Sequence, residues 1–497
     1  MRKALLILLL LVFSTFKTAS PESSPKDRIK VGVFYYPWYV KGYQNGHWSG
    51  DPKEADPNLT ATWWTVVDRP ALDWYASNDT SVIRRHLDWF AYAHIDFGII
   101  SWWGPYHHAP VYDDDWVKAI FDETRNYAPW FRWVILIEPC YSVSSQHLEV
   151  LDQFRNYTYD NYVKEYRDVW LNETNTGKPF LFWTYVDDFN NDTVRSEATN
   201  DTRLETKLLG QFLPGQKDRE DNIDWYTWSL FWGLNNTPPF PPKNGSMCVM
   251  PRYDETRLDP NNETGYEGRM NRTICCDPRL DGSAEGNEIP IGNVPLYDQQ
   301  WNEVLSNVSA ANLDYVLIAT WNDFTERTQI EPCYDLTSAY IGNTTYLLDR
   351  TKYWIQQLNA AVPNHVLNIT NVKWQPNASV PPSQDVEVNA TVTDSAHNIE
   401  NVWLRYTTNA TTQWNYTAMN LSSPNVYDGT IPPQQPNTLV NFTVIACDNA
   451  SNCLIDDKNG EYYGYIVAPE FSLLPIIMFF SVATLVVVIC TRKRALF

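Results

Sequence analysis

Apolar runs of strand length alternate with amphipathic segments from residue 30 to about residue 358. A continuous apolar run predicts a strand that is buried on both faces, because both sides must then contact nonpolar groups. Six runs predict such strands, at 31–38, 97–103, 133–139, 179–185, 246–253 and 315–321. We expect a seventh strand near 224–230, whereas the pattern does not show where an eighth would lie.

Helical periodicity occurs between these runs, at 81–93, 115–127 and 148–171. Alternation of strands and helices over this length favours a parallel α/β architecture, and a closed (β/α)8 TIM-type barrel over an open sheet. We therefore predict a barrel domain over residues 27–360. The charged segment 190–219 is predicted to be a solvent-exposed loop.

From 364 to 467 the pattern changes to short alternating segments, and strands are expected at 386–392, 401–407 and 439–446. Proline-rich turns such as 432–436 separate them, which is typical of a small immunoglobulin- or fibronectin-like β-sandwich. We expect this domain to act as a spacer between the barrel and a membrane. Glycan binding by the sandwich is the alternative.

The two ends of the chain predict its compartment. Residues 1–20 have a basic start, an apolar run and small residues, the layout of a secretory signal peptide. Residues 471–490 are uncharged and long enough to cross a bilayer, and a basic tail follows at 491–497. We predict an exported cell-surface protein with a single C-terminal transmembrane helix and the catalytic domain outside; a buried core helix at 471–490 is the alternative.

Composition narrows the range of partners. The net charge of −21 disfavours nucleic acid, because phosphate backbones bind basic surfaces. The chain has 22 Trp, 30 Tyr and 20 Phe, and aromatic faces together with carboxylates are typical of carbohydrate sites. Twenty Asn-x-Ser/Thr sequons fit an exported glycoprotein. Cys447 and Cys453 are predicted to form a disulfide across a loop, and the pairing of the other cysteines stays open.

Polar and aromatic residues gather where the predicted strands end. In a (β/α)8 barrel the carboxyl ends of the strands meet at one mouth, so residues far apart in sequence would line one pocket. The alternative is that each cluster is an ordinary strand end whose aromatic residues seal the barrel. The residues in question are Tyr36, Trp38, Trp102, Trp103, Glu138, Tyr185, Tyr253, Asn322 and Asp323.

The strongest candidate chemistry follows the last predicted strand. Asp323 and Glu326 are three residues apart, so a helical turn there would place both carboxylates on one face. Glycoside hydrolysis uses one protonated acid and a second carboxylate, and close spacing suits retention of configuration. Alternatively, Asp323 caps a short helix and Glu326 completes the cap. The sequence has no serine-hydrolase elbow, phosphate-binding loop or dinucleotide motif, and no spacing typical of a metal site.

Five motifs occur in the order found in glycoside hydrolase family 99, the endo-α-mannosidase and endo-α-mannanase family, and in its wider set of family 99-like domains. They are Tyr35-Tyr36-Pro37-Trp38-Tyr39, Gly46-His47-Trp48, Ile100-Ser101-Trp102-Trp103-Gly104, Ile137-Glu138-Pro139, and Trp321-Asn322-Asp323 through Glu326 with Gln329-Ile330-Glu331-Pro332. The chain resembles this family over most of residues 31–332.

The resemblance implies a (β/α)8 barrel and retaining, endo-acting cleavage of α-mannosidic or related α-linked oligo- or polysaccharides, without a metal or other cofactor. It implies that Asp323 is the base acting on the sugar 2-hydroxyl and that Glu326 is the acid/base residue. The substrate-binding residues would be Tyr36, Trp38, His47, Trp102, Trp103, Glu138, Tyr185, Tyr253 and Asn322. A polysaccharide-assembly protein and a non-catalytic glycan-binding surface protein on the same barrel are the alternatives.

Two further features bear on the resemblance. The family usually has Glu-Trp-His-Glu where this chain has Asp323-Phe324-Thr325-Glu326, and the shorter aspartate withdraws its carboxylate by about 1 Å, a displacement that can cost about a hundredfold in rate. The C-terminal segment, which opens with Pro469-Glu470-Phe471, resembles an archaeal sorting signal. That similarity implies processing by a sortase-like enzyme.

Overall fold

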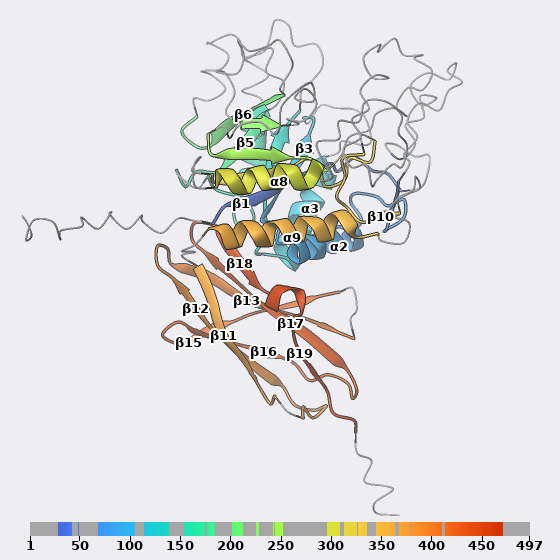
Figure 1. Ribbon diagram of the computed structural model, residues 1–497, viewed down its shortest axis with the longest axis vertical. Coiled ribbons are helices and arrows are strands. Elements are labelled where there is room, and N and C mark those ends of the chain that lie inside the picture. Colours follow the sequence, from blue (N-terminus) through green and yellow to red (C-terminus); the bar gives the residue numbers. More distant parts are fainter. Residues whose placement is uncertain are drawn as a thin grey trace, which may run out of the picture.

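The dominant element of the structure is a curled parallel sheet, which lies above the sandwich in Figure 1. The protein is represented by a computed structural model. It describes residues 28–41, 48, 68–104, 114–138, 154–173, 176–183, 201–211, 225–227, 242, 244–251, 296–308, 313–325, 327–334, 344–362, 367–377, 379–409 and 413–470. The strands of this sheet are β1 (Lys30–Tyr35), β3 (Phe97–Trp102), β4 (Arg132–Ile137), β5 (Phe180–Trp183), β6 (Glu205–Gln211), β7 (Trp225–Thr227), β8 (Ser246–Val249) and β9 (Tyr315–Ile318).

The strand order identifies the kind of sheet. The order is β7-β6-β5-β4-β3-β1-β9-β8, and every neighbouring pair is parallel. The two outermost strands, β7 and β8, also contact each other. Strands therefore follow one another around the curl in chain order, as in a TIM-type barrel. The predicted parallel α/β architecture is confirmed at this level.

The helices cover the outside of the curled sheet. They are α2 (Thr80–Ala93), α3 (Asp114–Tyr127), the π-helical turn η3 (Tyr159–Val163), α8 (Leu296–Asn307) and α9 (Tyr346–Ala361). In α2, the Asp79 side chain accepts from the Ser81 amide and caps the helix, which ends at His94 in the left-handed conformation. The predicted helices at 81–93 and 115–127 are confirmed to within one residue at their ends.

Alternation along each strand divides the barrel residues into two hydrophobic cores. The outer core lies between strands and helices, because it combines strand residues with residues of α2, α3, α8 and α9; it includes Val33, Tyr35, Leu87, Ile100, Trp102, Phe121, Ile135, Ile137, Trp301 and Ile355. The inner core is formed by the opposite faces of the strands and includes Phe34, Tyr36, Phe97, Ile99, Val134, Leu136, Phe182, Leu317 and Ala319.

Two expectations for the barrel are corrected. The strand missing from the sequence pattern is β6, which lies inside the segment 190–219 that was predicted to be a loop. Its sequence Glu-Thr-Lys-Leu-Leu-Gly-Gln is only weakly apolar, so neighbouring strands rather than hydrophobicity define it. The helix predicted at 148–171 is much shorter among the described residues, because helical structure there covers 154–163 and Trp170 already bridges to Trp133.

The C-terminal part forms two antiparallel sheets around a core of their own, which confirms a β-sandwich. One sheet has the order β11-β12-β16-β15, and the other has the order β14-β13-β17-β18 with β19 also paired to β17. The strands are β11 (Leu367–Gln375), β12 (Val386–Asp394), β13 (Ile399–Thr408), β14 (Asn415–Ala418), β15 (Asn420–Ser423), β16 (Val426–Ile431), β17 (Leu439–Asp448), β18 (Cys453–Asp456) and β19 (Tyr463–Ile466), with a short 3-10 helix η6 (Lys458–Gly460).

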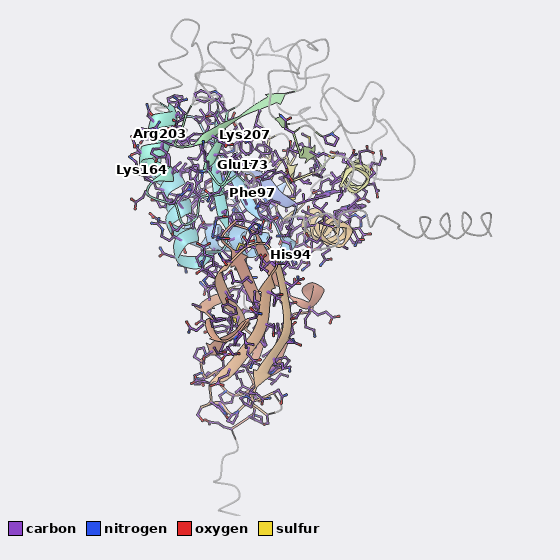
Figure 2. The ribbon with its side chains drawn as sticks, turned by 90° about the vertical axis from the view of Figure 1, so that its left-hand side faces the viewer. His94, Phe97, Lys164, Glu173, Arg203 and Lys207 are labelled. Carbon is purple, nitrogen blue, oxygen red and sulfur yellow. A yellow bond between two sulfur atoms is a disulfide. The ribbon has the colours of Figure 1, made fainter. Side chains whose placement is uncertain are left out.

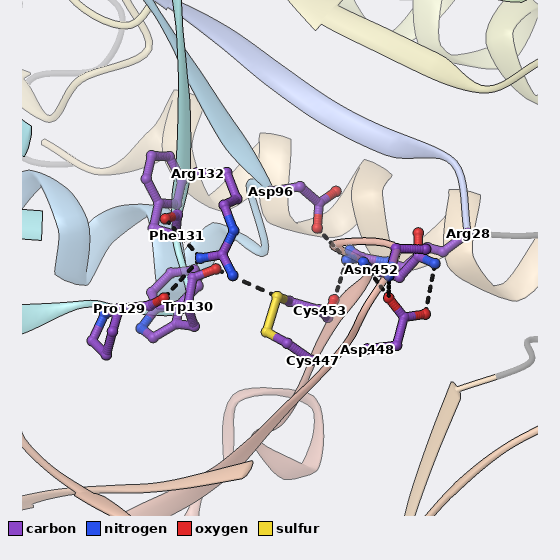
Figure 3. The surroundings of a disulfide bond; sticks show 11 residues. Arg28, Asp96, Pro129, Trp130, Phe131, Arg132, Cys447, Asp448, Asn452 and Cys453 are labelled. Carbon is purple, nitrogen blue, oxygen red and sulfur yellow. Dashed lines mark hydrogen bonds and ion pairs between the residues drawn. A yellow bond between two sulfur atoms is a disulfide. The ribbon is translucent and has the colours of Figure 1, made fainter. Parts of the chain in front are cut away.

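The predicted disulfide between Cys447 and Cys453 is present and joins β17 to β18 (Figure 3). It lies where the sandwich meets the barrel, because Cys453 Sγ is 3.4 Å from the carbonyl oxygen of Trp130, the residue two positions before β4. Arg28, which precedes β1, donates to the Cys453 carbonyl at 2.6 Å and also pairs with Asp96, which precedes β3. The sandwich therefore contacts the segments that lead into barrel strands.

Buried ion pairs add to this junction. Arg405 of β13 bonds Asp88 of α2 at 2.7 Å with both side chains buried, and its guanidinium lies 3.9 Å above the Trp414 ring. Asp457 accepts from Lys352 of α9 and bonds His94. Figure 1 shows α2 and α9 between the sheet and the sandwich, and Figure 2 shows His94 at the junction. The sandwich is thus docked firmly on the barrel, which adds a structural role to the spacer role expected from the sequence.

A short antiparallel ribbon of β2 (Arg69–Pro70) and β10 (Cys333–Tyr334) lies beyond the carboxyl end of β9. Within the described ranges, no helix combines the length and apolar composition that crossing a membrane requires. The predicted signal peptide at 1–20, transmembrane helix at 471–490 and basic tail at 491–497 all lie outside the described residues.

Candidate active site

The candidate site lies at the carboxyl ends of β1, β3, β4 and β9, opposite the edge that contacts the sandwich. Side chains alternate between the two faces of a strand, and this alternation decides which of them point into the barrel. Ser101 falls on the inward face of β3, and Glu138 and Tyr36, each one residue beyond its strand, fall on the inward faces of β4 and β1. Asp323 follows β9 by five residues and is buried. Four sequence-distant segments therefore bring polar groups to one end of the barrel, as the strand-end clusters predict.

Glu138 and Asp323 form the chemical centre of this site. Glu138 is buried, and its Oε1 accepts a hydrogen bond from Ser101 Oγ at 3.0 Å. Burial raises the pKa of Glu138 to about 8, and the nearby negative charge of Asp323 contributes to the increase, whereas the Ser101 bond opposes it. Glu138 is therefore protonated at neutral pH.

Asp323 is held by its own loop. Its Oδ1 accepts from the Thr325 amide at 3.1 Å and from Thr325 Oγ1 at 2.6 Å, while its amide donates to Thr320 Oγ1 at 2.9 Å. The chain then folds back, because the Ile330 amide donates to the Thr320 carbonyl. The predicted proximity of the Asp323 and Glu326 carboxylates stays a prediction, since Glu326 lies outside the described residues.

The return of this loop is fixed by a buried ion pair. Arg327 bonds both carboxylate oxygens of Asp68, at 3.1 and 3.2 Å, and Gln329 Nε2 donates to Asp68 at 2.8 Å. Asp68 and Gln329 are fully buried, so these bonds are shielded from water. No sequence signal marks Asp68, because its partners lie 259 and 261 residues away in the chain.

A second series of buried, hydrogen-bonded side chains lies behind the site. Tyr75 OH donates to Glu331 Oε2 at 2.7 Å, and Glu331 Oε1 lies 3.3 Å from His86 Nε2. His86 Nδ1 in turn bonds Tyr35 OH at 3.0 Å. Glu331 belongs to one of the motifs on which the family resemblance rests, so the sequence marks it. No sequence motif marks His86 or Tyr75. The negative charge of Glu331 adds to burial in raising the pKa of Tyr75 and of Tyr35.

Aromatic residues line the same end of the barrel. The Tyr36 and Trp38 rings lie 4.4 Å apart between centroids, and both residues belong to the inner core. Trp103 is half-buried and packs against the same core, so it follows Ser101 on the inward face of its segment. Tyr36, Trp38 and Trp103 thus lie at the same end of the barrel as Glu138.

Two predicted sugar-binding residues are placed differently. Trp102 belongs to the outer core, where its indole donates to Asp114 at 2.9 Å and stacks on Tyr157, because alternation turns it away from the barrel interior. Asn322 uses its amide to clamp β1, since Oδ1 accepts from the Tyr36 amide at 2.8 Å and Nδ2 donates to the Tyr36 carbonyl at 3.0 Å. We therefore assign both residues to the support of the site. The predicted residues Glu326, His47, Tyr185 and Tyr253 lie outside the described residues.

Comparison with known proteins adds similarities of overall structure. No family model matches the chain, and no curated protein matches it. Two solved structures of a GH99 endo-alpha-mannosidase from Bacteroides thetaiotaomicron each cover 67% of this chain and 98% of their own, with 19% and 18% identity and a TM-score of 0.46. A glycoside hydrolase-like protein covers 69% of this chain and 98% of its own, with 13% identity and a TM-score of 0.38.

Proposed function

We propose that this protein is a glycoside hydrolase that cleaves α-linked glycans of the mannose type, with retention and at internal linkages. The observation that carries the proposal is that buried Glu138, whose pKa is raised to about 8, and buried Asp323 lie at the same end of the barrel. Glycoside hydrolysis requires two carboxyl groups with different roles, and here the acid role is assigned to Glu326 and not to Glu138. The α-mannose preference rests on the family resemblance of the sequence motifs.

In this proposal Asp323 acts as the base toward the sugar, and Glu326 serves as the acid/base residue. Protonated Glu138 donates a hydrogen bond to a sugar oxygen beside Asp323, and its neutrality keeps a second negative charge out of the buried pocket. Tyr36, Trp38 and Trp103 supply apolar faces against the sugar ring. The protein would act at the cell surface, anchored through its C-terminal segment.

Hydrolysis of a substrate panel tests the proposal. We expect the purified full-length chain to cleave one or more members of a set of α-mannans, α-glucans and their aryl glycosides and fluorides, and to release products that retain the anomeric configuration by NMR. Glu326→Gln should remove this cleavage. Binding of the same glycans without any cleavage would contradict the proposal and favour a glycan-binding protein.

The pKa of Glu138 predicts a pH dependence of the activity. We expect kcat/KM to fall as the pH rises through about 8, because Glu138 then loses the proton that it donates. Glu138→Gln keeps a donor at this position at every pH and should remove that alkaline limb. Activity that stays constant to pH 10 in the unaltered protein would contradict this assignment.

The free energy of unfolding should also depend on the raised pKa of Glu138, and its measurement needs no substrate. The folded state keeps the Glu138 proton up to about pH 8, whereas an unfolded chain releases it near its ordinary pKa of 4.5. The stability that this group contributes is therefore fully present below pH 4.5 and is lost as the pH rises through about 8. Relative to Glu138→Gln, the free energy of unfolding of the unaltered protein should fall across this interval, as measured by urea unfolding at a series of pH values.

A further inference from the structure

The buried hydroxyl of Tyr39 forms hydrogen bonds to the main chain on both sides of Asp323. Tyr39 OH donates to the carbonyl oxygen of Asn322 at 2.5 Å and accepts from the amide of Phe324 at 3.1 Å. These two groups belong to the residues immediately before and after Asp323. The position of the Asp323 main chain relative to β1 therefore depends on one side-chain oxygen.

Tyr39 is itself held rigidly. It is fully buried, its ring stacks on Trp48 with 3.9 Å between centroids, and its main chain bonds Ser77 in both directions. Burial, together with the negative charge of Asp323, keeps the pKa of Tyr39 well above its usual range, so the hydroxyl retains the proton that it donates to Asn322. Tyr39 therefore provides a fixed reference point for the loop after β9.

Thr325 completes the arrangement by orienting the side chain. Its amide and its Oγ1 both bond Asp323 Oδ1, which restricts the torsions of a side chain that has only two. Tyr39 sets where the Asp323 main chain lies, whereas Thr325 sets the direction in which its carboxylate points. The two contacts act on the same residue from different elements.

The neighbouring residue Asn322 is tied down independently. Its Nδ2 lies 3.3 Å from Tyr75 OH, which in turn donates to the buried carboxylate of Glu331 at 2.7 Å. Together with the Asn322 bonds to Tyr36, these contacts leave the segment before Asp323 little freedom to shift. A local change at Tyr39 or Thr325 should therefore alter the Asp323 geometry without unfolding the loop.

We propose that Tyr39 and Thr325 are positioning residues for Asp323, and that the two together hold its carboxylate in the geometry that proton transfer to or from a sugar hydroxyl requires. The catalytic part of this inference rests on the proposed function, because it takes Asp323 as the base. Both residues act through Asp323. A displacement of the carboxylate by about 1 Å can lower the rate about a hundredfold, which sets the scale of the effect.

Tyr39→Phe and Thr325→Val test this inference with minimal change in volume. We expect each to lower kcat about ten- to a hundredfold while KM stays within about twofold, because the geometry of Asp323 changes and the aromatic sugar contacts stay. Tyr92→Phe is the matched control, since Tyr92 OH bonds Asp349 in the helical layer away from the site. It should leave both kcat and KM unchanged.

A double-mutant cycle separates positioning from general destabilisation. In the Asp323→Asn background, Tyr39→Phe and Thr325→Val should have little further effect on kcat, because the group that they position is already lost. Equal effects in both backgrounds would overturn the inference, and so would unchanged kcat in the single variants. If Tyr39→Phe does not fold, Thr325→Val decides the question alone.

A measurement that does not depend on hydrolysis separates the positioning of Asp323 from the proposed function. Because the Asp323 charge contributes to the raised pKa of Glu138, moving that carboxylate away should lower the pKa of Glu138, as measured by infrared titration of its carboxyl band with Glu138→Gln as the reference. Absence of hydrolysis by the unaltered protein would contradict the proposed function only. An unchanged Glu138 titration in both variants would contradict the positioning of Asp323 by Tyr39 and Thr325.

Discussion

Asp323→Asn is expected to lower the rate of glycan hydrolysis by about 10²- to 10⁴-fold, the range typical for loss of a general acid or base. The asparagine amide cannot take up the proton that the carboxylate accepts. Its Oδ1 can still accept from Thr325, so the loop should keep its structure. The measurement is kcat/KM on the best substrate of the panel, together with the thermal unfolding temperature.

Asp160→Asn is the matched control for this change. Asp160 lies on η3, is exposed and pairs with the exposed Lys164 four residues later, so its replacement should not alter hydrolysis. Full activity of Asp323→Asn would show that another carboxylate is the base. A loss of activity accompanied by unfolding would be resolved by Asp323→Glu, which restores the carboxylate with one additional methylene and should recover part of the rate.

Arg405→Met is expected to destabilise the folded protein by about 3–5 kcal/mol, because it leaves Asp88 buried without its charge partner. Burial alone raises the pKa of Asp88, and Arg405 is the principal group that opposes this increase. Tyr127 OH bonds both Asp88 oxygens but carries no compensating charge. Urea unfolding at pH 7 measures the effect, and the barrel and the sandwich should unfold in a single transition.

The double variant Arg405→Met/Asp88→Leu removes both charges and should recover most of the lost free energy of unfolding. Lys164→Met is the control for an exposed ion pair, and its expected effect is below about 1 kcal/mol. An Arg405→Met variant as stable as the unaltered protein would mean that water reaches Asp88. Two separate unfolding transitions in the unaltered protein would mean that the sandwich folds independently of the barrel.

The docking of the sandwich also bears on how the site is supported. Its contacts lie on α2, α9 and the segments that enter β1, β3 and β4, whereas the candidate site lies at the other ends of these strands. His94 and Lys352 hold the pKa of Asp457 below its ordinary value against the effect of burial. The sandwich thus contacts the amino-terminal edge of the barrel, opposite the candidate site.

The alternation of side chains along a strand accounts for the placement of Tyr36 and Glu138 at the carboxyl-end edge of the barrel. Asp323 reaches the same edge through the loop after β9. The same alternation distinguishes Trp103 from Trp102, which are adjacent in sequence but face opposite sides of β3. Composition and motif alone could not separate these two tryptophans, because the face of a strand is decided by what packs against it.

What the sequence determined by itself is the local and periodic part of this protein. Apolar runs located seven of the eight barrel strands, alternating segments predicted the sandwich, and a separation of six residues predicted the Cys447–Cys453 disulfide. Each of these features depends on residues close together in the chain. The weakly apolar β6 was missed, because only its pairing with β5 and β7 makes it a strand.

Only the tertiary structure decided how distant groups act on one another. The raised pKa of Glu138 comes mainly from its burial by the fold, with a contribution from the charge of Asp323, 185 residues away. The loop that holds Asp323 in turn depends on Tyr39 and Asp68. Burial and electrostatic interaction depend on distance in space and on exclusion of water, neither of which is written in residue spacing. The sequence therefore identified candidate residues at the strand ends, and the fold decided which of them are buried together and how they are oriented.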